Sequence, residues 1–179
     1  MDLIPGTRVD AADLSPVSNS LTGDDIAAAV KIVYFLDRGG KPFILRWAHD
    51  ISIGDLRDNN VILVGGFNND LTLKRTSRLR FVFEGGDHIK DQVDTKLRWS
   101  ITHDSKGEAV DDYAIISRLI EPTTGAILIT VAGIGGGGTR AAGNFLASPQ
   151  QVADAVSRAP AGWNKQNIEH ADTTPRQDN

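Results

Sequence analysis

A run of glycines followed by a threonine and an arginine is the stretch whose residue types could do chemistry. Residues 133–138 hold five glycines and are interrupted only by Ile134, and Thr139 and Arg140 come next. Glycine lets a ligand approach the main chain closely, because it lacks a side chain and tolerates unusual backbone angles. Residues 126–132 before the run are almost wholly apolar, and apolar residues recur at helical spacing after it. A strand, a glycine loop and a helix N-terminus form an anion-binding arrangement, since unpaired N–H groups and the helix dipole point to one place.

The sequence therefore predicts an anion or small-ligand contact at this loop, with Thr139 as the helix N-cap. The predicted contacts are the backbone N–H groups of Gly135, Gly136, Gly137, Gly138 and Thr139, the Thr139 hydroxyl and the Arg140 guanidinium. The open alternative is a tight turn that needs glycine for packing only. The loop matches G-x-G-x-x-G, but no strand ending in Asp or Glu follows about 20 residues later and no lysine follows the glycines, so neither a dinucleotide fold nor a Walker A loop is indicated.

A second glycine loop follows a second apolar strand. Residues 61–64 read VILV and run directly into GGFNND. Two such strands are typical of neighbouring central strands whose C-terminal ends meet at one edge, where ligands bind in open α/β sheets. The predicted ligand residues here are Gly65, Gly66, Asn68 and Asn69, together with Arg78 from the basic segment that follows. Equally, Asn and Gly are the usual residues of tight turns, and the basic segment could be a charged strand edge.

The 179 residues, of which 40% are hydrophobic and 23% charged, are enough for one globular domain with a sizeable core. We expect residues 1–19 to be a lead-in or linker, 20–170 a single α/β domain, and 171–179 a disordered tail. The expected fold is a three-layer, Rossmann-like domain with a mixed, mostly buried sheet of about six or seven strands. Its sequence-predicted elements are a helix capped by Thr22, a strand at 43–47, a helical turn capped by Ser52, a strand near Arg78 and Arg80, a hairpin of 113–120 with 126–132, a helix capped by Ser148 and a last strand at 167–170.

Composition and charge exclude several classes of function. The net charge of −4 argues against nucleic acid as a partner of this chain, and the absence of cysteine excludes disulfides and zinc–thiolate sites. No apolar run reaches 18 residues and no signal peptide is evident, so we expect a cytoplasmic protein of bacterial type without a membrane span. No metal site and no cofactor are indicated, since the histidines are scattered and the nearby Asp50, Asp55 and Asp58 have the spacing of ordinary helix-start acids.

Several segments resemble a family of uncharacterised bacterial α/β domains of the acidobacterial type. The matching segments are DLRDNNVILVGGFNN, LRFVFEG, DDYAIISRL, TGAILITVAGIGGGGTRAAGNFL and RAPAGWNKQN, which together span most of residues 24–167. Such domains look like the C-terminal part of longer proteins, often behind a winged-helix DNA-binding or signalling segment. The resemblance implies a sensor or regulatory module and carries no established catalytic residues.

Three functions remain open from sequence. The first is a sensor or regulatory domain that binds a small molecule or anion at the two glycine loops. The second is an enzyme that acts on a nucleotide or sugar phosphate at the same edge, although no nucleophile elbow or acid–base pair is present and binding is favoured over catalysis. The third is a homo-oligomeric interaction module, in which an apolar strand edge and Trp99 or Trp163 form a homodimer.

Overall fold

The computed structural model describes residues 21–175, so the predicted lead-in of residues 1–19 lies outside the described residues. The helices are α1 (Gly23–Arg38), α2 (Ile53–Asp58), α3 (Asp70–Thr76), α4 (Gly136–Leu146) and α5 (Pro149–Ser157), with 3-10 turns η2 (Ala48–Asp50) and η3 (Trp163–Lys165). The strands are β1 (Val61–Val64), β2 (Phe81–Glu84), β3 (His88–Asp91), β4 (Arg98–Ser100), β5 (Thr102–His103), β6 (Ala109–Ile120), β7 (Ile127–Gly133) and β8 (Ile168–Pro175).

The strands form two sheets. In the larger one, of five strands, β7 lies between β1 and β6, while β5 and β8 both pair with β6. β1 and β7 are parallel, and β6 and β7 form the predicted antiparallel hairpin. The smaller sheet contains β2, β3 and β4, all antiparallel. The α/β class is therefore confirmed, but a single sheet of six or seven strands is not found, because these three short strands pair with one another instead.

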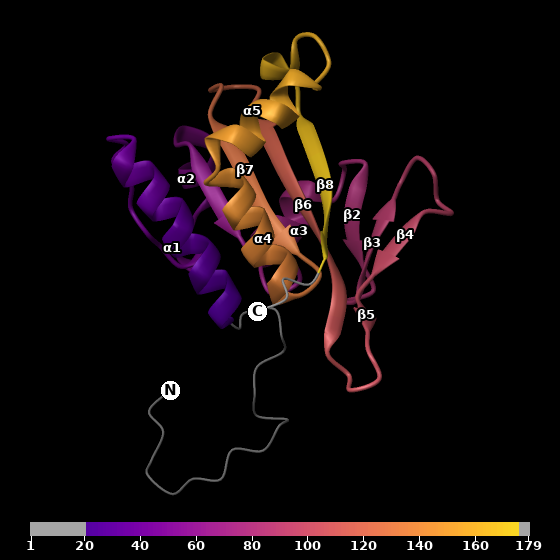
Figure 1. Ribbon diagram of the computed structural model, residues 1–179. Helices are drawn as coiled ribbons and strands as arrows, with labels where there is room; N and C mark the ends of the chain where they lie inside the picture. The colour runs from indigo at the N-terminus through magenta and orange to yellow at the C-terminus, as the bar shows by residue number, and fades with distance from the viewer. Residues whose placement is uncertain (1–20, 176–179) are drawn as a thin grey trace, which may run out of the picture.

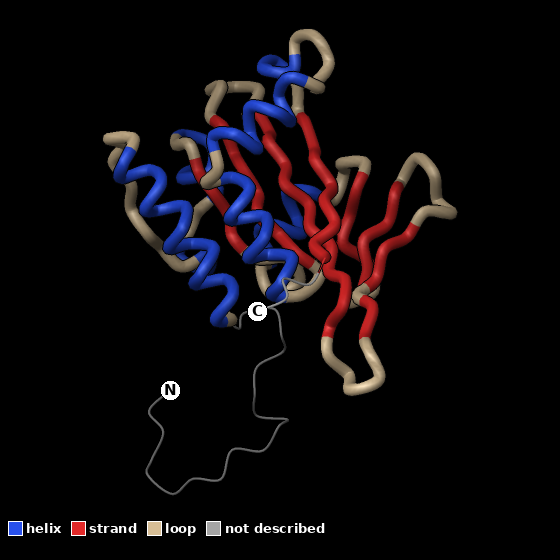
Figure 2. The backbone as a smooth tube through the Cα atoms, viewed as in Figure 1, coloured by secondary structure: helices blue, strands red, loops and turns tan. Residues whose placement is uncertain are grey.

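Helices cover both faces of the five-stranded sheet (Figures 1 and 2). α1, α4 and α5 lie over one face, and α2 and α3 lie behind the other. Alternation along the central strands sends side chains to both sides. On the first side Val131 packs with Ile32 of α1 and Ala142 of α4, and on the other side Leu128 packs with Leu56 of α2. These layers explain why β1 and β7 are almost wholly apolar.

Local sequence signals account for most of the helix boundaries. The Thr22 hydroxyl accepts a hydrogen bond from the Asp25 N–H while the Asp25 carboxylate accepts from the Thr22 N–H, which completes a capping box at α1. Ser52 caps α2 in the same way, and Ser148 caps α5 with proline at the start of the helix. These three predicted caps, at Thr22, Ser52 and Ser148, are confirmed.

Four predicted elements differ from the structure. Residues 43–47 form no regular strand, although their side chains alternate, because the chain there pairs with no neighbouring strand. Residues 70–76 form a helix that was not predicted, since Asn69 caps them, and the strand expected near Arg78 and Arg80 begins at Phe81. The N-cap of α4 is Gly135 and not Thr139, which lies in the first turn. β8 runs to Pro175, so residues 171–175 continue the strand along β6 rather than belonging to a tail.

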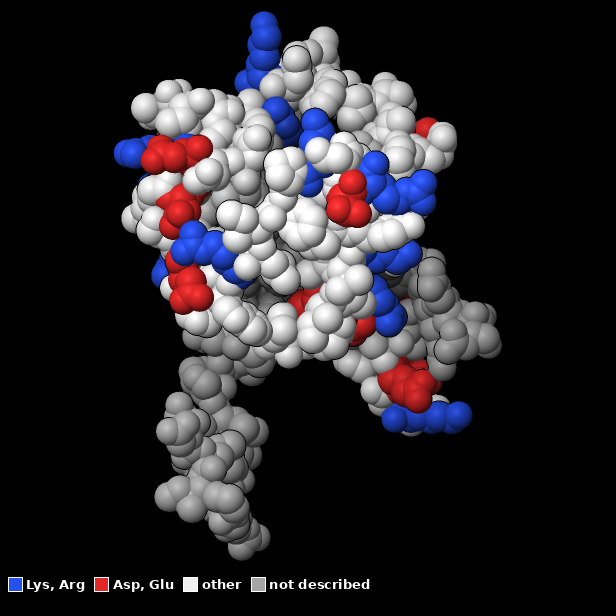
Figure 3. Space-filling model, turned by 90° about the vertical axis from the view of Figure 1, so that its left-hand side faces the viewer, with Lys and Arg blue, Asp and Glu red and all other residues white. Residues whose placement is uncertain are grey.

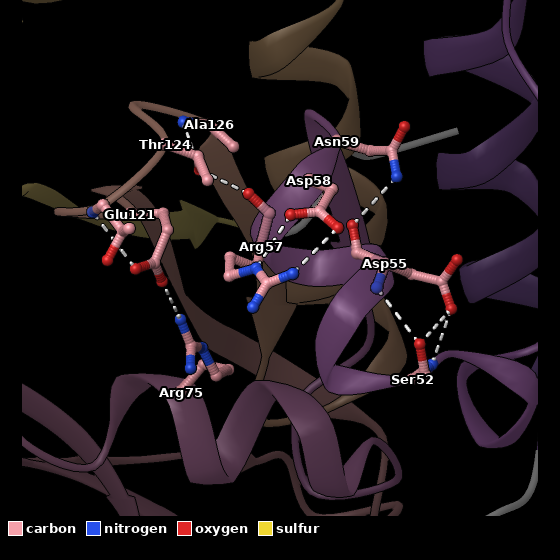
Figure 4. Close-up of polar contacts among 10 residues, drawn as sticks. Ser52, Asp55, Arg57, Asp58, Asn59, Arg75, Glu121, Thr124 and Ala126 are labelled. Carbon is pink, nitrogen blue, oxygen red and sulfur yellow. Dashed lines mark hydrogen bonds and ion pairs between the residues drawn. The ribbon is translucent and has the colours of Figure 1, made fainter.

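Polar contacts hold the edge of the sheet that lies opposite the glycine loop (Figure 4). The Thr124 hydroxyl, in the turn between β6 and β7, donates to the Arg57 carbonyl oxygen of α2. Arg75 of α3 forms an ion pair with Glu121 of the same turn, with 3.6 Å between nitrogen and oxygen. α2 and α3 are thus fixed to the beginning of β7, and the ends of β7 and β1 are left for the candidate site.

Candidate functional site

The two predicted loops meet at one edge of the five-stranded sheet. Because β1 and β7 are parallel neighbours, their C-terminal ends lie side by side, and the N-termini of α1 and α4 point to the same edge (Figure 1). The backbones touch: a Cβ atom on Gly66 would lie 2.4 Å from the Gly133 carbonyl oxygen. Gly66 therefore permits a main-chain approach that no other residue allows.

The first turn of α4 binds a carboxylate of the chain itself. Asp112 of β6 accepts hydrogen bonds from the N–H groups of Gly135, at 3.0 Å, and Gly138, at 2.6 Å. The Thr139 hydroxyl accepts from the Gly133 N–H at 3.0 Å and donates to the Gly135 carbonyl oxygen. Asp112 is only 7% exposed. The anion-binding geometry that the sequence predicts is therefore present, and an internal aspartate lies in it.

Close packing explains several glycines of this loop and of α4. A Cβ atom on Gly133 would lie 2.2 Å from the Thr139 nitrogen, and one on Gly136 would lie 2.3 Å from a carboxylate oxygen of Asp24. At Gly137 the nearest atom would be an Asp112 oxygen at 3.3 Å. The loop thus needs small residues for its own fold, whatever it contacts in addition.

Asn68 and Asn69 are both engaged by neighbouring groups. Asn69 caps α3 by accepting from the N–H groups of Leu71 and Thr72, and its amide donates to the Val64 carbonyl oxygen at 2.9 Å. The Asn68 amide donates to the Asp25 carboxylate at 2.7 Å. This contact joins the loop after β1 to the beginning of α1.

The two predicted arginines lie apart. Arg140 of α4 is at this edge and forms an ion pair with Asp24 of α1, with 3.1 Å between the charged atoms. Arg78 is exposed in the turn between α3 and β2, after the C-terminal end of α3, whereas Asn69 lies at its N-terminal end. Gly65, with a backbone φ of 107°, makes the bend after β1, where its N–H donates to the Val131 carbonyl oxygen.

Next to these loops the structure contains a cavity of about 490 Å³ that the sequence does not indicate. One face of α1, residues 43–51 and β1 form its walls, and Asp25, Asn68 and Asn69 line it. Apolar side chains make up most of the lining, among them Ile26, Ala29, Val33, Phe43, Trp47 and Ile62. Figure 3, which views the molecule from the side of α1, shows an uncharged central area with charged side chains around it. A mostly apolar cavity with a few convergent polar groups is the usual form of a small-molecule site.

Asp25 brings a negative charge to the lining of this cavity. Asp25 is 3% exposed, and three hydrogen bonds end on its Oδ2 atom, from the Thr22 N–H, the Thr22 hydroxyl and Asn68. Within residues 21–175, no Lys, Arg or His lies within 4 Å of the Asp25 carboxylate. Asp25 is therefore a buried carboxylate whose charge is balanced by hydrogen bonds and by the N-terminus of α1 alone.

Arg46, which also lines the cavity, binds the segment that carries Asp50, Asp55 and Asp58. It donates to Asp55 at 3.1 Å and to the Asp50 carbonyl oxygen. The hydrogen bond from the Ser52 hydroxyl holds the pKa of Asp55 below its usual value, and the Arg57 guanidinium does the same for Asp58. These carboxylates have structural partners, and among the described residues no group of three or more His, Asp or Glu side chains could hold a metal ion.

Sequence reasoning missed Asp25 and Asp112 as residues of this edge. The spacing of Thr22 and Asp25 is a capping-box signal, which predicts a helix start but says nothing of burial beside a cavity. Asp112 precedes an apolar strand in a pair of aspartates, and nothing in that pattern shows that a loop more than 20 residues later folds over it.

The structure also has no helix, among the described ones, that could cross a membrane.

Comparison with protein-family models, with curated proteins and with solved structures gives no match, so the function is argued from the geometry of the chain itself.

Proposed function

We propose that this domain is a sensor or regulatory module that binds a small organic molecule in the cavity between α1, residues 43–51 and β1. The observation that carries the proposal is the cavity itself, of about 490 Å³, with mostly apolar walls and a few polar side chains, among them Asp25, Asn68 and Asn69. Its position fits the sequence-based expectation, because Asn68 and Asn69, two of the predicted ligand residues, line it. The cavity also lies beside the C-terminal end of a parallel strand, where α/β folds bind ligands.

The glycine loop has a supporting role in this proposal. Its amides at Gly135 and Gly138 hold Asp112, so the loop keeps α4 and the end of β7 in place next to the cavity. The ligand then contacts α1 and the Asn68 loop, and an anion at α4 would have to displace Asp112.

A screen of small molecules by thermal shift tests the proposal, because a ligand that binds only the folded state must raise the midpoint of unfolding. Ala29→Phe fills the cavity from α1, and we expect it to abolish the shift given by any cavity ligand. Ala153→Phe is the matched control, since Ala153 is exposed on α5 and does not line the cavity. A ligand whose shift survives Ala29→Phe would place binding elsewhere.

A homodimer is the second candidate, because α1 and the segment after it expose large apolar side chains. Val30 and Tyr34 of α1 are 60% and 59% exposed, and Ile44 and Trp47 are 87% and 55% exposed. Sedimentation velocity across protein concentrations tests this, with Ile44→Asp as the variant that should keep the protein monomeric. A monomer at all concentrations would remove this candidate. Trp99, one of the tryptophans expected at a dimer contact, packs against Phe81 within its own sheet.

A further inference from the structure

We infer that the cavity selects an amphipathic ammonium ion, that is, a small apolar compound with a protonated amine at one end. The inference rests on the proposed function, because it names the chemical class of the cavity's ligand. It follows from the juxtaposition of apolar walls with the buried carboxylate of Asp25.

The two carboxylate oxygens of Asp25 differ in the hydrogen bonds that they accept. All three hydrogen bonds to this side chain end on Oδ2, from Thr22 and from Asn68. Oδ1 retains its acceptor capacity, and the residue belongs to the cavity lining. An ammonium group supplies both the donor that Oδ1 can accept and the positive charge that the described side chains do not bring within 4 Å.

Other charges near the cavity favour a cation over an anion. Asp24 and Asp112 are carboxylates of the same sheet edge, and Arg140 is bound to Asp24. The two basic side chains of the lining already face carboxylates: Arg46 pairs with Asp55, and His49 lies 3.6 Å from an oxygen of Asp50. A ligand carboxylate would therefore meet like charge at Asp25, whereas an ammonium would complete a buried ion pair.

The backbone of β1 adds hydrogen-bonding groups to the cavity wall. The Gly65 N–H donates to the Val131 carbonyl oxygen of β7. Backbone N–H and C=O groups of alternate residues in a strand point to the same side. The backbone groups of Leu63 therefore point to β7, and those of Ile62 and Val64 point to the free edge of the sheet. Asn69 already binds the Val64 carbonyl oxygen. The Ile62 carbonyl oxygen, on the same side of β1 as that of Val64, is a further hydrogen-bond acceptor in the cavity wall.

Three matched probes test the inference on the unmodified protein: n-hexylamine, its uncharged N-acetyl derivative and n-hexanoate. Isothermal titration calorimetry at neutral pH and fixed salt should show that n-hexylamine binds at least tenfold more tightly than the other two. Trp47 lines the cavity, so its fluorescence gives a second readout of occupancy. Equal affinity for the amine and the acetamide, or tighter binding of hexanoate, would overturn the inference.

A pair of neighbouring variants then assigns the selectivity. Asp25→Asn keeps an oxygen for the capping box and removes the charge, and we expect it to lose at least tenfold in amine affinity while acetamide affinity is unchanged. Asp24→Asn removes a charge one residue away that is bound to Arg140, and should keep the preference for the amine. Amine selectivity that persists in Asp25→Asn would overturn the assignment to Asp25.

The same data separate this inference from the proposed function. If the acetamide binds, and Ala29→Phe abolishes its binding, the cavity is a ligand site even where the amine has no advantage. If no probe binds and a wider screen finds no compound sensitive to Ala29→Phe, the proposed function fails and the inference fails with it.

Discussion

Removing the carboxylate of Asp112 should both destabilise the domain and create an anion site at α4. In Asp112→Ala the N–H groups of Gly135 and Gly138 lose their acceptor in a place where Asp112 is only 7% exposed. Hydrogen bonds to a charged acceptor contribute about 1.5–3 kcal/mol each. Since water can partly replace the carboxylate, we expect a loss of roughly 3 kcal/mol in the free energy of unfolding. For a domain of this size that corresponds to a fall of about 6–12 °C in Tm.

Urea unfolding followed by circular dichroism measures this loss, and Asp111→Ala is the control. Asp111 precedes Asp112 in the same strand, but its carboxylate accepts a hydrogen bond from the exposed Thr102 hydroxyl, so the loss of free energy in Asp111→Ala should be below about 1 kcal/mol.

Formate can supply the missing carboxylate and so tests whether the vacated N–H groups bind an anion. Sodium formate should raise the Tm of Asp112→Ala relative to sodium chloride at equal ionic strength, because it adds about 1.4 kcal/mol to the free energy of unfolding when its concentration is ten times its Kd. It should not act on the unmodified protein through this loop, because Asp112 occupies the amides. A loss below about 0.5 kcal/mol in Asp112→Ala, or an equal effect of formate on both proteins, would refute the reasoning.

Two further predictions concern packing and pH. Gly143→Ala should cost about 1–3 kcal/mol by urea unfolding, because its Cβ atom would lie 2.6 Å from that of Ala28 and push α1 from α4; an unchanged midpoint would show that the helices separate freely. Hydrogen bonds from Arg80 lower the pKa of Asp91 to about 2, so this pair stabilises the fold above the ordinary carboxyl pKa, near 4, and the stabilisation is lost as the pH falls toward 2. Asp91→Asn should lower Tm at neutral pH and flatten its decline in acid, and a parallel decline in both proteins would contradict this origin.

Signals that act over a few residues were sufficient to predict several elements. Thr22 and Ser52 lie three positions before an aspartate, and this spacing alone is enough to form a capping box. The apolar runs at β1 and β7 and the five-residue turn before β7 predict neighbouring strands and a hairpin, and both are confirmed.

Features that depend on distant partners could not be predicted in this way. Residues 43–47 alternate like a strand, but no strand lies beside them to accept their hydrogen bonds. Asn69 suits a turn or a helix cap equally by residue type, and in the structure it caps α3 while its amide also binds the Val64 carbonyl oxygen. The cavity has walls from α1, residues 43–51 and β1, three segments whose relative placement no local pattern encodes.

The parallel pair of β1 and β7 also has a consequence for the order of folding. β6, β7 and α4 follow one another along the chain with short connections, so they can assemble with little loop-closure entropy. β1 joins them across a large separation: Asn60, just before β1, and Ile127, at the start of β7, are 67 positions apart and share a hydrogen bond. Contacts at such separation form late and slow the folding of a domain. Since β1 and α1 form two walls of the cavity, we expect the cavity to be completed late in folding, after the hairpin of β6 and β7 has formed.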